Sequence, residues 1–195
     1  MIAIIDYKCG NLKSVENALS RLGCEYVLTS DPEVILSASK VILPGVGNAA
    51  EAMANLREAG LVDVIKSIRK PVLGICVGMQ IMCRDSEEGN CECIGLFDSH
   101  VKRFIPTPEC KVPHMGWNAI GNLEKKLFKD MKGGQYVYFV HSYYPTLCQD
   151  TIATCVHAGQ MFSAALKYEN FYGTQFHPEK SGDVGEQILS NFLAL

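Results

Sequence analysis

The chain has 195 residues, of which 48% are hydrophobic and 20% are charged, and its formal net charge is −3. This composition is typical of a single globular domain, and it excludes a disordered chain, a collagen and a coiled coil. The small acidic excess does not favour a nucleic-acid or anionic-membrane partner, and no apolar stretch approaches the roughly 20 residues that a membrane helix needs.

The first residues indicate a strand and not a targeting signal. Residues 2–5 are apolar, Asp6 follows them directly, and no basic leader is present. We therefore expect a cytoplasmic protein. The nine cysteines include no Cys-x-x-Cys pair, so we expect mostly free thiols in a reducing compartment. A metal site built from Cys91 and Cys93 with Cys83, Cys110 or His100 fits no standard zinc spacing, so we expect neither a metal nor a cofactor.

Apolar strands alternate with helical stretches over the first 84 residues. The predicted strands cover residues 2–6, 25–28, 40–43 and 71–76, and the predicted helices cover 11–22, 32–38, 49–57, 61–69 and 77–84. Asp31 and Pro32 are typical of a helix start, and Gly23 of a helix end. Such an alternation predicts a mostly parallel central sheet with helices on both faces.

The pattern changes beyond Ser86. Short strand-like pieces separated by turn residues run to about Ala165, and the clearest cover residues 135–141 and 151–157. They predict an antiparallel extension of the same sheet. A final strand over 171–176 and a closing helix over 184–193 complete an α/β fold of the flavodoxin-like kind, in one domain over residues 1–195.

The segment Gly74-Ile75-Cys76-Val77-Gly78 lies between a predicted strand and a predicted helix. This is the pattern of a nucleophile elbow with sulfur in place of oxygen, and its two glycines make room for a sharp turn. The helix N-terminus would favour the reactive thiolate. Taken alone, the pattern also fits a buried structural cysteine, but its strand–turn–helix context favours a nucleophile.

The segment Gln175-Phe176-His177-Pro178-Glu179 ends the last predicted strand. Residues two apart on an extended chain point the same way, and Pro178 disfavours helix at His177. His177 and Glu179 can therefore act as a base and its orienting carboxylate. A lone His-x-Glu would more simply be a solvated turn, but this pair and the elbow support each other.

A glycine-bounded loop, Pro44-Gly45-Val46-Gly47, follows the third predicted strand. It can turn main-chain N–H groups toward a developing oxyanion, with the N–H of Val77 as the second donor. From this segment alone, a simple turn is the better interpretation.

Together these segments resemble the class I, triad-type glutamine amidotransferases, and within them the glutaminase subunits of imidazole glycerol phosphate synthase. The elbow, continued by Met79-Gln80, and the His-Pro-Glu segment carry the broad class. The segments 112–118 and 138–143 carry the narrower family, and shorter matches at 6–7, 10–12 and 44–47 extend the resemblance over nearly the whole chain.

The resemblance implies an amidotransferase-like fold and a glutaminase reaction. Cys76 would attack the side-chain amide of glutamine, His177 would take and return the proton, and Glu179 would orient His177. Gly47 and Val77 would form the oxyanion hole. The implied substrate-binding residues are Gln80, Glu88, Ser142 and Tyr143, and the Glu88 carboxylate suits the ammonium group of a free amino acid.

The resemblance also implies a partner. Ammonia would pass to a cyclase (synthase) subunit with a barrel fold in a heterodimer of histidine biosynthesis. Met115, Trp117 and Lys180 are the candidate interface residues. A partner that favours the competent state of the oxyanion loop would activate the enzyme, so we expect the isolated chain to be nearly inactive.

Two departures and three alternatives remain open. Val77 stands where leucine is more usual, and Lys8 and Cys9 stand where the family more often has glycine and a small or apolar residue. The alternatives are an amidotransferase for another acceptor, such as a surface sugar, a cysteine hydrolase or peptidase, and a non-catalytic scaffold. We expect His114 and His141 to be structural and Lys125-Lys126 to lie on a solvated face.

Overall fold

The computed structural model describes all residues except 9, 11, 109 and 125. The family departure at Cys9, the predicted helix start at Asn11 and the predicted solvated Lys125 therefore lie outside the described residues. Within the described part of the chain, no helix is both long and apolar enough to cross a membrane.

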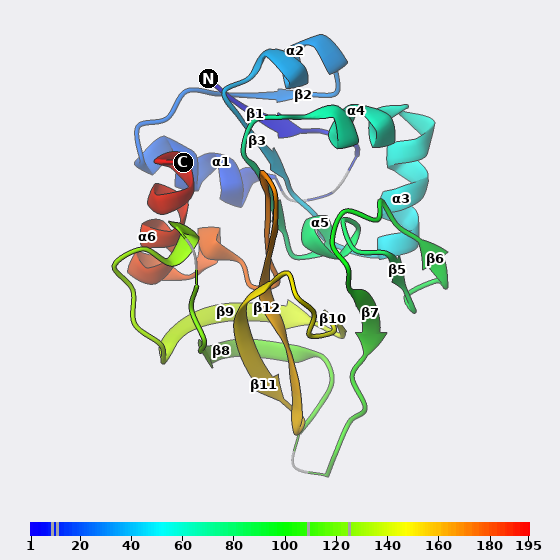
Figure 1. Cartoon of the computed structure of the whole chain (residues 1–195), viewed down its shortest axis with the longest axis vertical. Coiled ribbons are helices and arrows are strands. Elements are labelled where there is room, and N and C mark those ends of the chain that lie inside the picture. Colours follow the sequence, from blue (N-terminus) through cyan, green and yellow to red (C-terminus); the bar gives the residue numbers. More distant parts are fainter. Residues whose placement is uncertain (9, 11, 109, 125) are drawn as a thin grey trace.

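A seven-stranded sheet in the order β11-β12-β13-β4-β3-β1-β2 forms the centre of the molecule (Figure 1). Its parallel strands are β1 (Ile2–Ile5), β2 (Tyr26–Thr29), β3 (Lys40–Leu43), β4 (Val72–Ile75) and β13 (Phe171–Thr174). Two antiparallel strands, β12 (Gln160–Tyr168) and β11 (Thr151–His157), extend it. This topology confirms the predicted mostly parallel sheet and its antiparallel extension.

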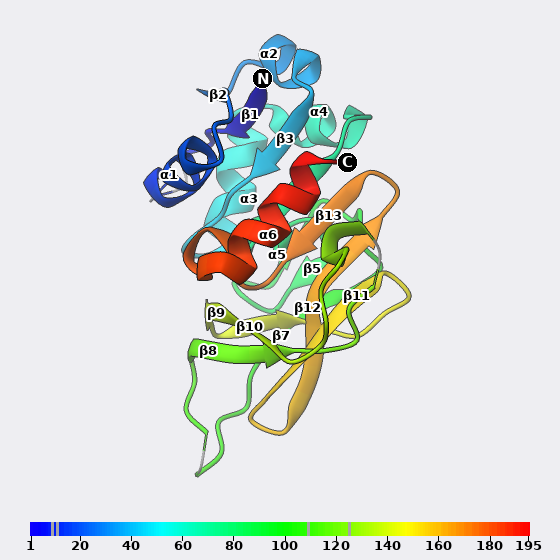
Figure 2. The ribbon, with the colours of Figure 1, turned by 90° about the vertical axis from the view of Figure 1, so that its left-hand side faces the viewer.

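Helices cover both faces of this sheet, as predicted. Their bounds are α1 (Lys13–Arg21), α2 (Pro32–Ser37), α3 (Ala49–Glu58), α4 (Leu61–Ser67), α5 (Val77–Gln80) and α6 (Gly182–Leu193). Figure 2 shows α1 and α6 on one face and α3 and α4 on the other. All residues of β1, β4 and β13 are buried because helices or loops cover them on both sides.

The helix predicted over residues 77–84 is shorter in the structure. It ends at Gln80 because the carbonyl groups of the next three residues bond to a distant segment instead of the next helical turn. Ile81 accepts from the N–H of Ile94 at 2.8 Å, and Cys83 accepts from that of Gly95 at 2.8 Å. Tertiary hydrogen bonds here replace the helical ones that the apolar pattern favours.

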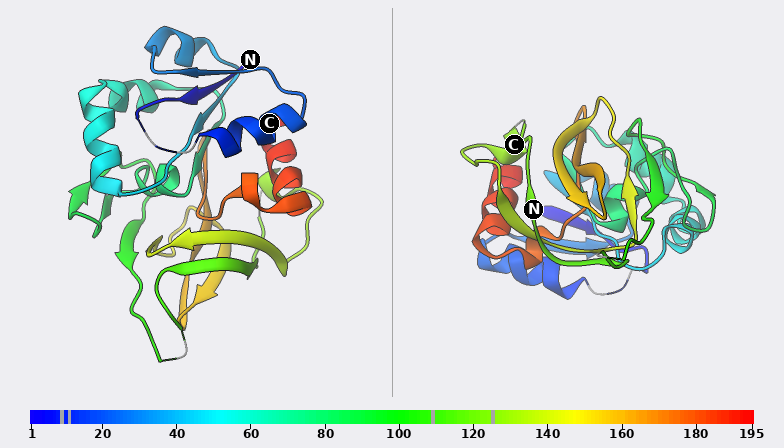
Figure 3. Two further views of the ribbon diagram at one scale, coloured as in Figure 1. Left: turned by 180° about the vertical axis from the view of Figure 1, so that it is seen from behind. Right: turned by 90° about the horizontal axis from the view of Figure 1, so that it is seen from below.

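The other strands form two smaller sheets, so the prediction that the pieces beyond Ser86 all extend the central sheet was wrong for them. A four-stranded sheet contains β5 (Asp85–Ser86), β6 (Cys91–Glu92), β7 (His100–Arg103) and β10 (Tyr143–Pro145). An antiparallel ribbon contains β8 (His114–Ile120) and β9 (Gln135–His141). The ribbon passes beneath α6 and the short 3₁₀ helix η2 (Pro178–Lys180), as Figure 3 shows. A second 3₁₀ helix, η1 (Lys126–Phe128), precedes β9.

Solvent exposure explains why the ribbon is separate. Along β9, buried and more exposed residues alternate, so one face of the ribbon contacts the core and the other faces outward. The central strands β1, β4 and β13 are buried on both faces instead.

Candidate active site

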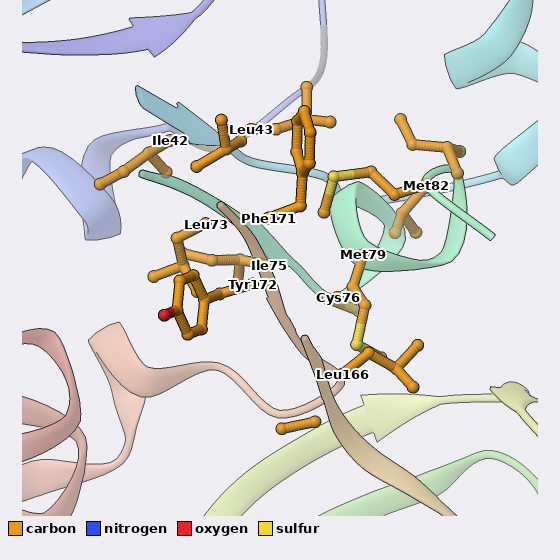
Figure 4. Packing of buried hydrophobic residues seen from close by; sticks show 14 of the residues in the cluster. Ile42, Leu43, Leu73, Ile75, Cys76, Met79, Met82, Leu166, Phe171 and Tyr172 are labelled. Carbon is orange, nitrogen blue, oxygen red and sulfur yellow. The ribbon is translucent and has the colours of Figure 1, made fainter. Parts of the chain in front are cut away.

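Cys76 lies at the carboxyl end of β4, between that strand and α5 (Figure 4). Its φ of 53° and ψ of −112° place a non-glycine residue in a strained part of backbone space. A Cβ atom added at Gly78 would collide with the carbonyl oxygen of Leu43, and one added at Gly74 would collide with Met82 and with the main chain of Gly78. The two glycines of the motif therefore make the sharp turn sterically possible.

A cavity of about 190 Å³ opens above this turn. Pockets for drug-sized molecules hold about 300–1,000 Å³, so this one suits an amino-acid-sized ligand. Its lining includes nine of the residues predicted for the site or its interface, namely Gly47, Cys76, Val77, Gln80, Glu88, Ser142, Tyr143, His177 and Lys180. The remaining lining residues are Val46, Val140 and His141. Four segments of the chain, residues 46–47, 76–88, 140–143 and 177–180, thus meet in one pocket.

His177 is held from behind by Glu179. Nδ1 of His177 lies 2.7 Å from Oε1 of Glu179, and these two side chains are 2% and 4% exposed. Because a carboxylate only accepts, Nδ1 carries the proton and Nε2 is left for the cavity side. Among the described residues, Nε2 has no hydrogen-bond partner. The ring is therefore oriented, and one nitrogen is free to exchange a proton.

Electrostatics favour the charged form of this ring. Burial by itself lowers the pKa of His177, but the adjacent Cys76 sulfur and the Glu179 carboxylate outweigh burial and raise that pKa above its ordinary value. An imidazolium here would stabilise a neighbouring thiolate, which is the nucleophilic form of cysteine.

The loop after β3 packs directly on the elbow. A Cβ atom added at Gly45 would collide with the main-chain nitrogen of Gly78, and the hydroxyl of Tyr7 donates to the carbonyl of Pro44 at 2.7 Å. Gly47 has a φ of +91°, which favours glycine. Val77 is the first residue of α5, so its N–H has no partner within the helix. Both predicted oxyanion donors therefore line the cavity beside the sulfur.

Two of the predicted substrate-binding side chains, Glu88 and Gln80, already make hydrogen bonds within the protein. Oε2 of Glu88 accepts from the N–H of Ala49 at 2.7 Å, and burial raises the pKa of Glu88, although this hydrogen bond opposes the rise. Nε2 of Gln80 donates to the carbonyl of Tyr143 at 2.8 Å and to Oε1 of Gln175 at 2.9 Å. Both amide hydrogens of Gln80 are thus engaged, which leaves its carbonyl oxygen as the only polar atom it can offer to a ligand.

Met115 and Trp117 lie outside the cavity. They are 63% and 54% exposed on the outer face of the β8–β9 ribbon, where Trp117 packs edge to face against Tyr138. Lys180 lines the cavity itself.

Two residues of the site had no predicted role. The carbonyl oxygen of Val140 lies 4.0 Å from Sγ of Cys76, and Nε2 of Gln175 lies 3.6 Å from the same atom. The Val140 contact is made by the main chain, so its residue type gives no signal. Gln175 could have been found, because it precedes His177 by two positions on an extended segment and therefore points the same way.

Metal ligation finds no support among the described residues, where no three His, Cys, Asp or Glu side chains could hold a metal ion together. The sulfur atoms of Cys91 and Cys93 lie 3.9 Å apart in a larger open hollow of about 840 Å³. That hollow contains none of the predicted site residues. The larger hollow is therefore not the candidate active site.

Comparisons with known proteins identify the family of the chain. The family described as "Glutamine amidotransferase class-I" matches residues 3–195. The chain is 56% identical over 195 residues to a Bacteroides fragilis protein named imidazole glycerol phosphate synthase subunit HisH, covering 100% of this chain and 99% of that one. A protein of the same name from Vibrio parahaemolyticus is 45% identical over 201 residues, covering 100% and 98%.

Solved structures share the fold at lower identity. A crystal structure of a glutamine amidotransferase superposes with a TM-score of 0.73 at 16% identity, covering 100% of this chain and 98% of that one. A glutamine amidotransferase from Thermotoga maritima gives 0.66 at 18% identity, covering 99% and 82%. The family match over residues 3–195 and the full-length relatives at about half identity decide the assignment: the chain belongs to the class-I glutamine amidotransferases and, within them, to the family of HisH subunits of imidazole glycerol phosphate synthase.

Proposed function

We propose that this chain, acting as one domain, hydrolyses glutamine to glutamate and ammonia through Cys76, His177 and Glu179, and passes the ammonia to a cyclase subunit in histidine biosynthesis. The observation that carries the proposal is the convergence of Cys76 and His177 in one amino-acid-sized cavity, with Glu179 bonded to the far side of the imidazole. The names of the full-length relatives support the choice of acceptor.

The reaction begins with attack of the Cys76 sulfur on the side-chain carbonyl carbon of glutamine. The C–S bond forms while the carbonyl oxygen takes the negative charge, and the N–H groups of Gly47 and Val77 stabilise it. His177, which holds the thiol proton on Nε2, protonates the departing nitrogen, so ammonia leaves and a thioester remains. Water then adds with His177 as the base, the C–S bond breaks, and glutamate leaves.

Substrate selection follows from the charges around the cavity. The Glu88 carboxylate would pair with the ammonium group of free glutamine, whereas the substrate carboxylate needs donors. The main-chain and side-chain groups of Ser142 and Tyr143, which also line the cavity, would supply them. The Gln80 carbonyl oxygen would accept from the substrate. A peptide-linked glutamine lacks the free ammonium and would lose the Glu88 contact.

The partner would be a cyclase subunit with a barrel fold, bound as a heterodimer to the outer face of the β8–β9 ribbon. This face carries Met115, Trp117, Tyr136 and Tyr138, and exposed apolar and aromatic residues gathered on one surface are typical of an interface core. Lys180, at the cavity, would lie near the ammonia exit. We place the complex in the cytoplasm.

Ammonia release from glutamine, measured with and without the cyclase subunit, tests the proposal. We expect slow release by the chain alone and strong stimulation by the partner, because the glycine-rich oxyanion loop can rest with an N–H turned away. Cys76→Ala should abolish release while the fold is retained, and Cys24→Ala, at a half-buried thiol outside the cavity, serves as the control. Hydrolysis of peptides without hydrolysis of glutamine, or full turnover by Cys76→Ala, would contradict the proposal.

A further inference from the structure

A buried amide touches the sulfur of Cys76 from below the cavity. Gln175 follows β13, its side chain is fully buried, and its Nε2 lies 3.6 Å from Sγ of Cys76. Burial of an uncharged amide against a sulfur requires that its hydrogen-bonding groups be satisfied there. The contact therefore either links the segments that follow β4 and β13, or changes the reactivity of the Cys76 sulfur.

The direction of this hydrogen bond is fixed by a carbonyl oxygen that can only accept. The main-chain oxygen of Tyr143 accepts a hydrogen bond from Nε2 of Gln80 at 2.8 Å. The oxygen and nitrogen of the Gln80 amide therefore cannot be exchanged, because two oxygens would then face each other. The same Gln80 nitrogen then donates to Oε1 of Gln175 at 2.9 Å. The nitrogen of Gln175, and not its oxygen, must consequently face Cys76.

The same carbonyl also bonds to His141, which in turn bonds to a second buried histidine, His114. Nδ1 of His141 lies 2.8 Å from the Tyr143 oxygen and so carries a proton, which leaves its Nε2 to accept from Nδ1 of His114 at 3.0 Å. Nε2 of His114 in turn accepts from Nδ2 of Asn118 at 3.2 Å. Every donor in this series finds an acceptor, and the orientation of Gln175 itself follows from the hydrogen bond of Gln80 to the Tyr143 carbonyl.

We infer that Gln175 is a further catalytic residue, whose side-chain N–H donates to the Cys76 sulfur, holds it in place and stabilises its thiolate, with Gln80 as the positioning residue that aims this amide. The role of Gln175 in turnover rests on the proposed function, whereas its contact with the Cys76 sulfur is independent of that function. No proton is transferred in this step. The N–H stabilises the negatively charged sulfur before attack and again when the thioester releases it, and it contributes less while the sulfur is bonded to carbon.

Alkylation of Cys76 by iodoacetamide tests the inference without glutamine. The full-length chain is treated across about pH 6 to about pH 10, and the peptide that contains Cys76 is quantified by mass spectrometry. Gln175→Met keeps the length of the side chain and removes the N–H. We expect the midpoint of the alkylation curve to move up by about one pH unit and the rate near neutral pH to fall about tenfold.

Thr174→Val is the matched control, because Thr174 is the buried neighbour of Gln175 and its hydroxyl has no partner among the described residues. This variant should reproduce the wild-type curve. A Gln175→Met curve that superimposes on the wild type would overturn the inference. In the presence of the partner, Gln175→Met should lower kcat and leave KM nearly unchanged, since the amide touches the nucleophile and not the substrate.

Two further measurements cover the case in which Gln175→Met does not fold. Gln175→Glu retains an oxygen for Gln80 and places a second oxygen against the sulfur, and at high pH its ionised form should slow alkylation. In the wild-type chain, the side-chain amide protons of Gln175, followed by NMR, should shift across the same pH range as the alkylation curve. Gln175 amide resonances that do not shift as Cys76 ionises would contradict the inference. Absence of ammonia release by the wild-type complex would instead refute only the proposed function.

Discussion

The carbonyl oxygen of Val140 lies 4.0 Å from the sulfur of Cys76, and Val140 is the residue that pairs with exposed Met115 across the β8–β9 ribbon. A single strand, β9, therefore separates the outer face of the ribbon from the nucleophile. A partner bound to that face would rest against the same strand that forms one wall of the cavity. A small shift of β9 caused by the partner would therefore be enough to change the cavity.

Trp117→Ala should weaken binding of the cyclase partner at least tenfold, or about 1.4 kcal/mol or more. Trp117 is 54% exposed and packs against Tyr138, so the ring is available to a partner and already held in place. Isothermal titration of the two proteins measures the change. Leu36→Ala, at an exposed leucine on α2, should leave affinity unchanged. Equal affinities for the wild type and Trp117→Ala would remove the ribbon face from the interface.

Glu179→Gln should reduce partner-stimulated turnover about 10²- to 10⁴-fold with a small change in KM. The carboxylate holds Nδ1 of His177 at 2.7 Å and helps to raise the pKa of that ring, so a neutral amide should lower the pKa of His177. Steady-state kinetics measure the first effect, and NMR titration of the imidazole measures the second. Glu186→Gln, at an exposed position of α6, is the control. Unchanged turnover would show that His177 needs no orienting carboxylate.

Gly78→Ala should destabilise the fold by about 3 kcal/mol or more, because the new methyl group would collide with the main-chain oxygen of Leu43, which cannot move aside as a side chain can. Urea unfolding measures the loss. Gly133→Ala adds a methyl group that meets only the Cα of Gly121 at 3.9 Å, so it should change stability by less than about 0.5 kcal/mol. Similar midpoints for the two variants would mean that the elbow tolerates a side chain at position 78.

The elbow and the central sheet could be predicted because their signals are local. Apolar runs bounded by glycine and proline indicate buried parallel strands, and the two glycines around Cys76 indicate the close approach of backbone that the structure contains. The triad needed one further step, since Cys76 and His177 follow two adjacent parallel strands, β4 and β13, whose carboxyl ends lie side by side. Parallel pairing is what brings two distant motifs to one edge.

The second half of the chain could not be predicted in the same way because its partners are not local. β5 pairs with both β6 and β7, and β7 pairs with β10 about forty residues away, so no short pattern specifies that sheet. The truncation of α5 depends on donors at residues 94–97. Likewise, the role of Gln175 depends on Gln80, which is 95 positions away in the sequence.

Acid should destabilise the protein through the two buried histidines of the ribbon. Burial lowers the pKa of His141 to about 3, and burial with the nearby His157 lowers that of His114 to about 4, whereas both titrate near 6.5 in the unfolded chain. As pH falls below about 6.5, the unfolded state therefore binds protons that the folded state does not. The stabilising contribution is fully present above about pH 6.5 and is lost as pH falls, toward about 4 for His114 and toward about 3 for His141.

The expected slope of the free energy of unfolding is up to about 2.7 kcal/mol per pH unit for two protons, and urea midpoints between about pH 7 and about pH 5 measure it. His141→Asn keeps a donor for the Tyr143 carbonyl and removes one titrating group, so its slope should be shallower by up to about 1.4 kcal/mol per pH unit. If His141→Asn and the wild type lose stability in parallel on acidification, His141 is not neutral in the folded state, and its Nε2 does not accept from His114.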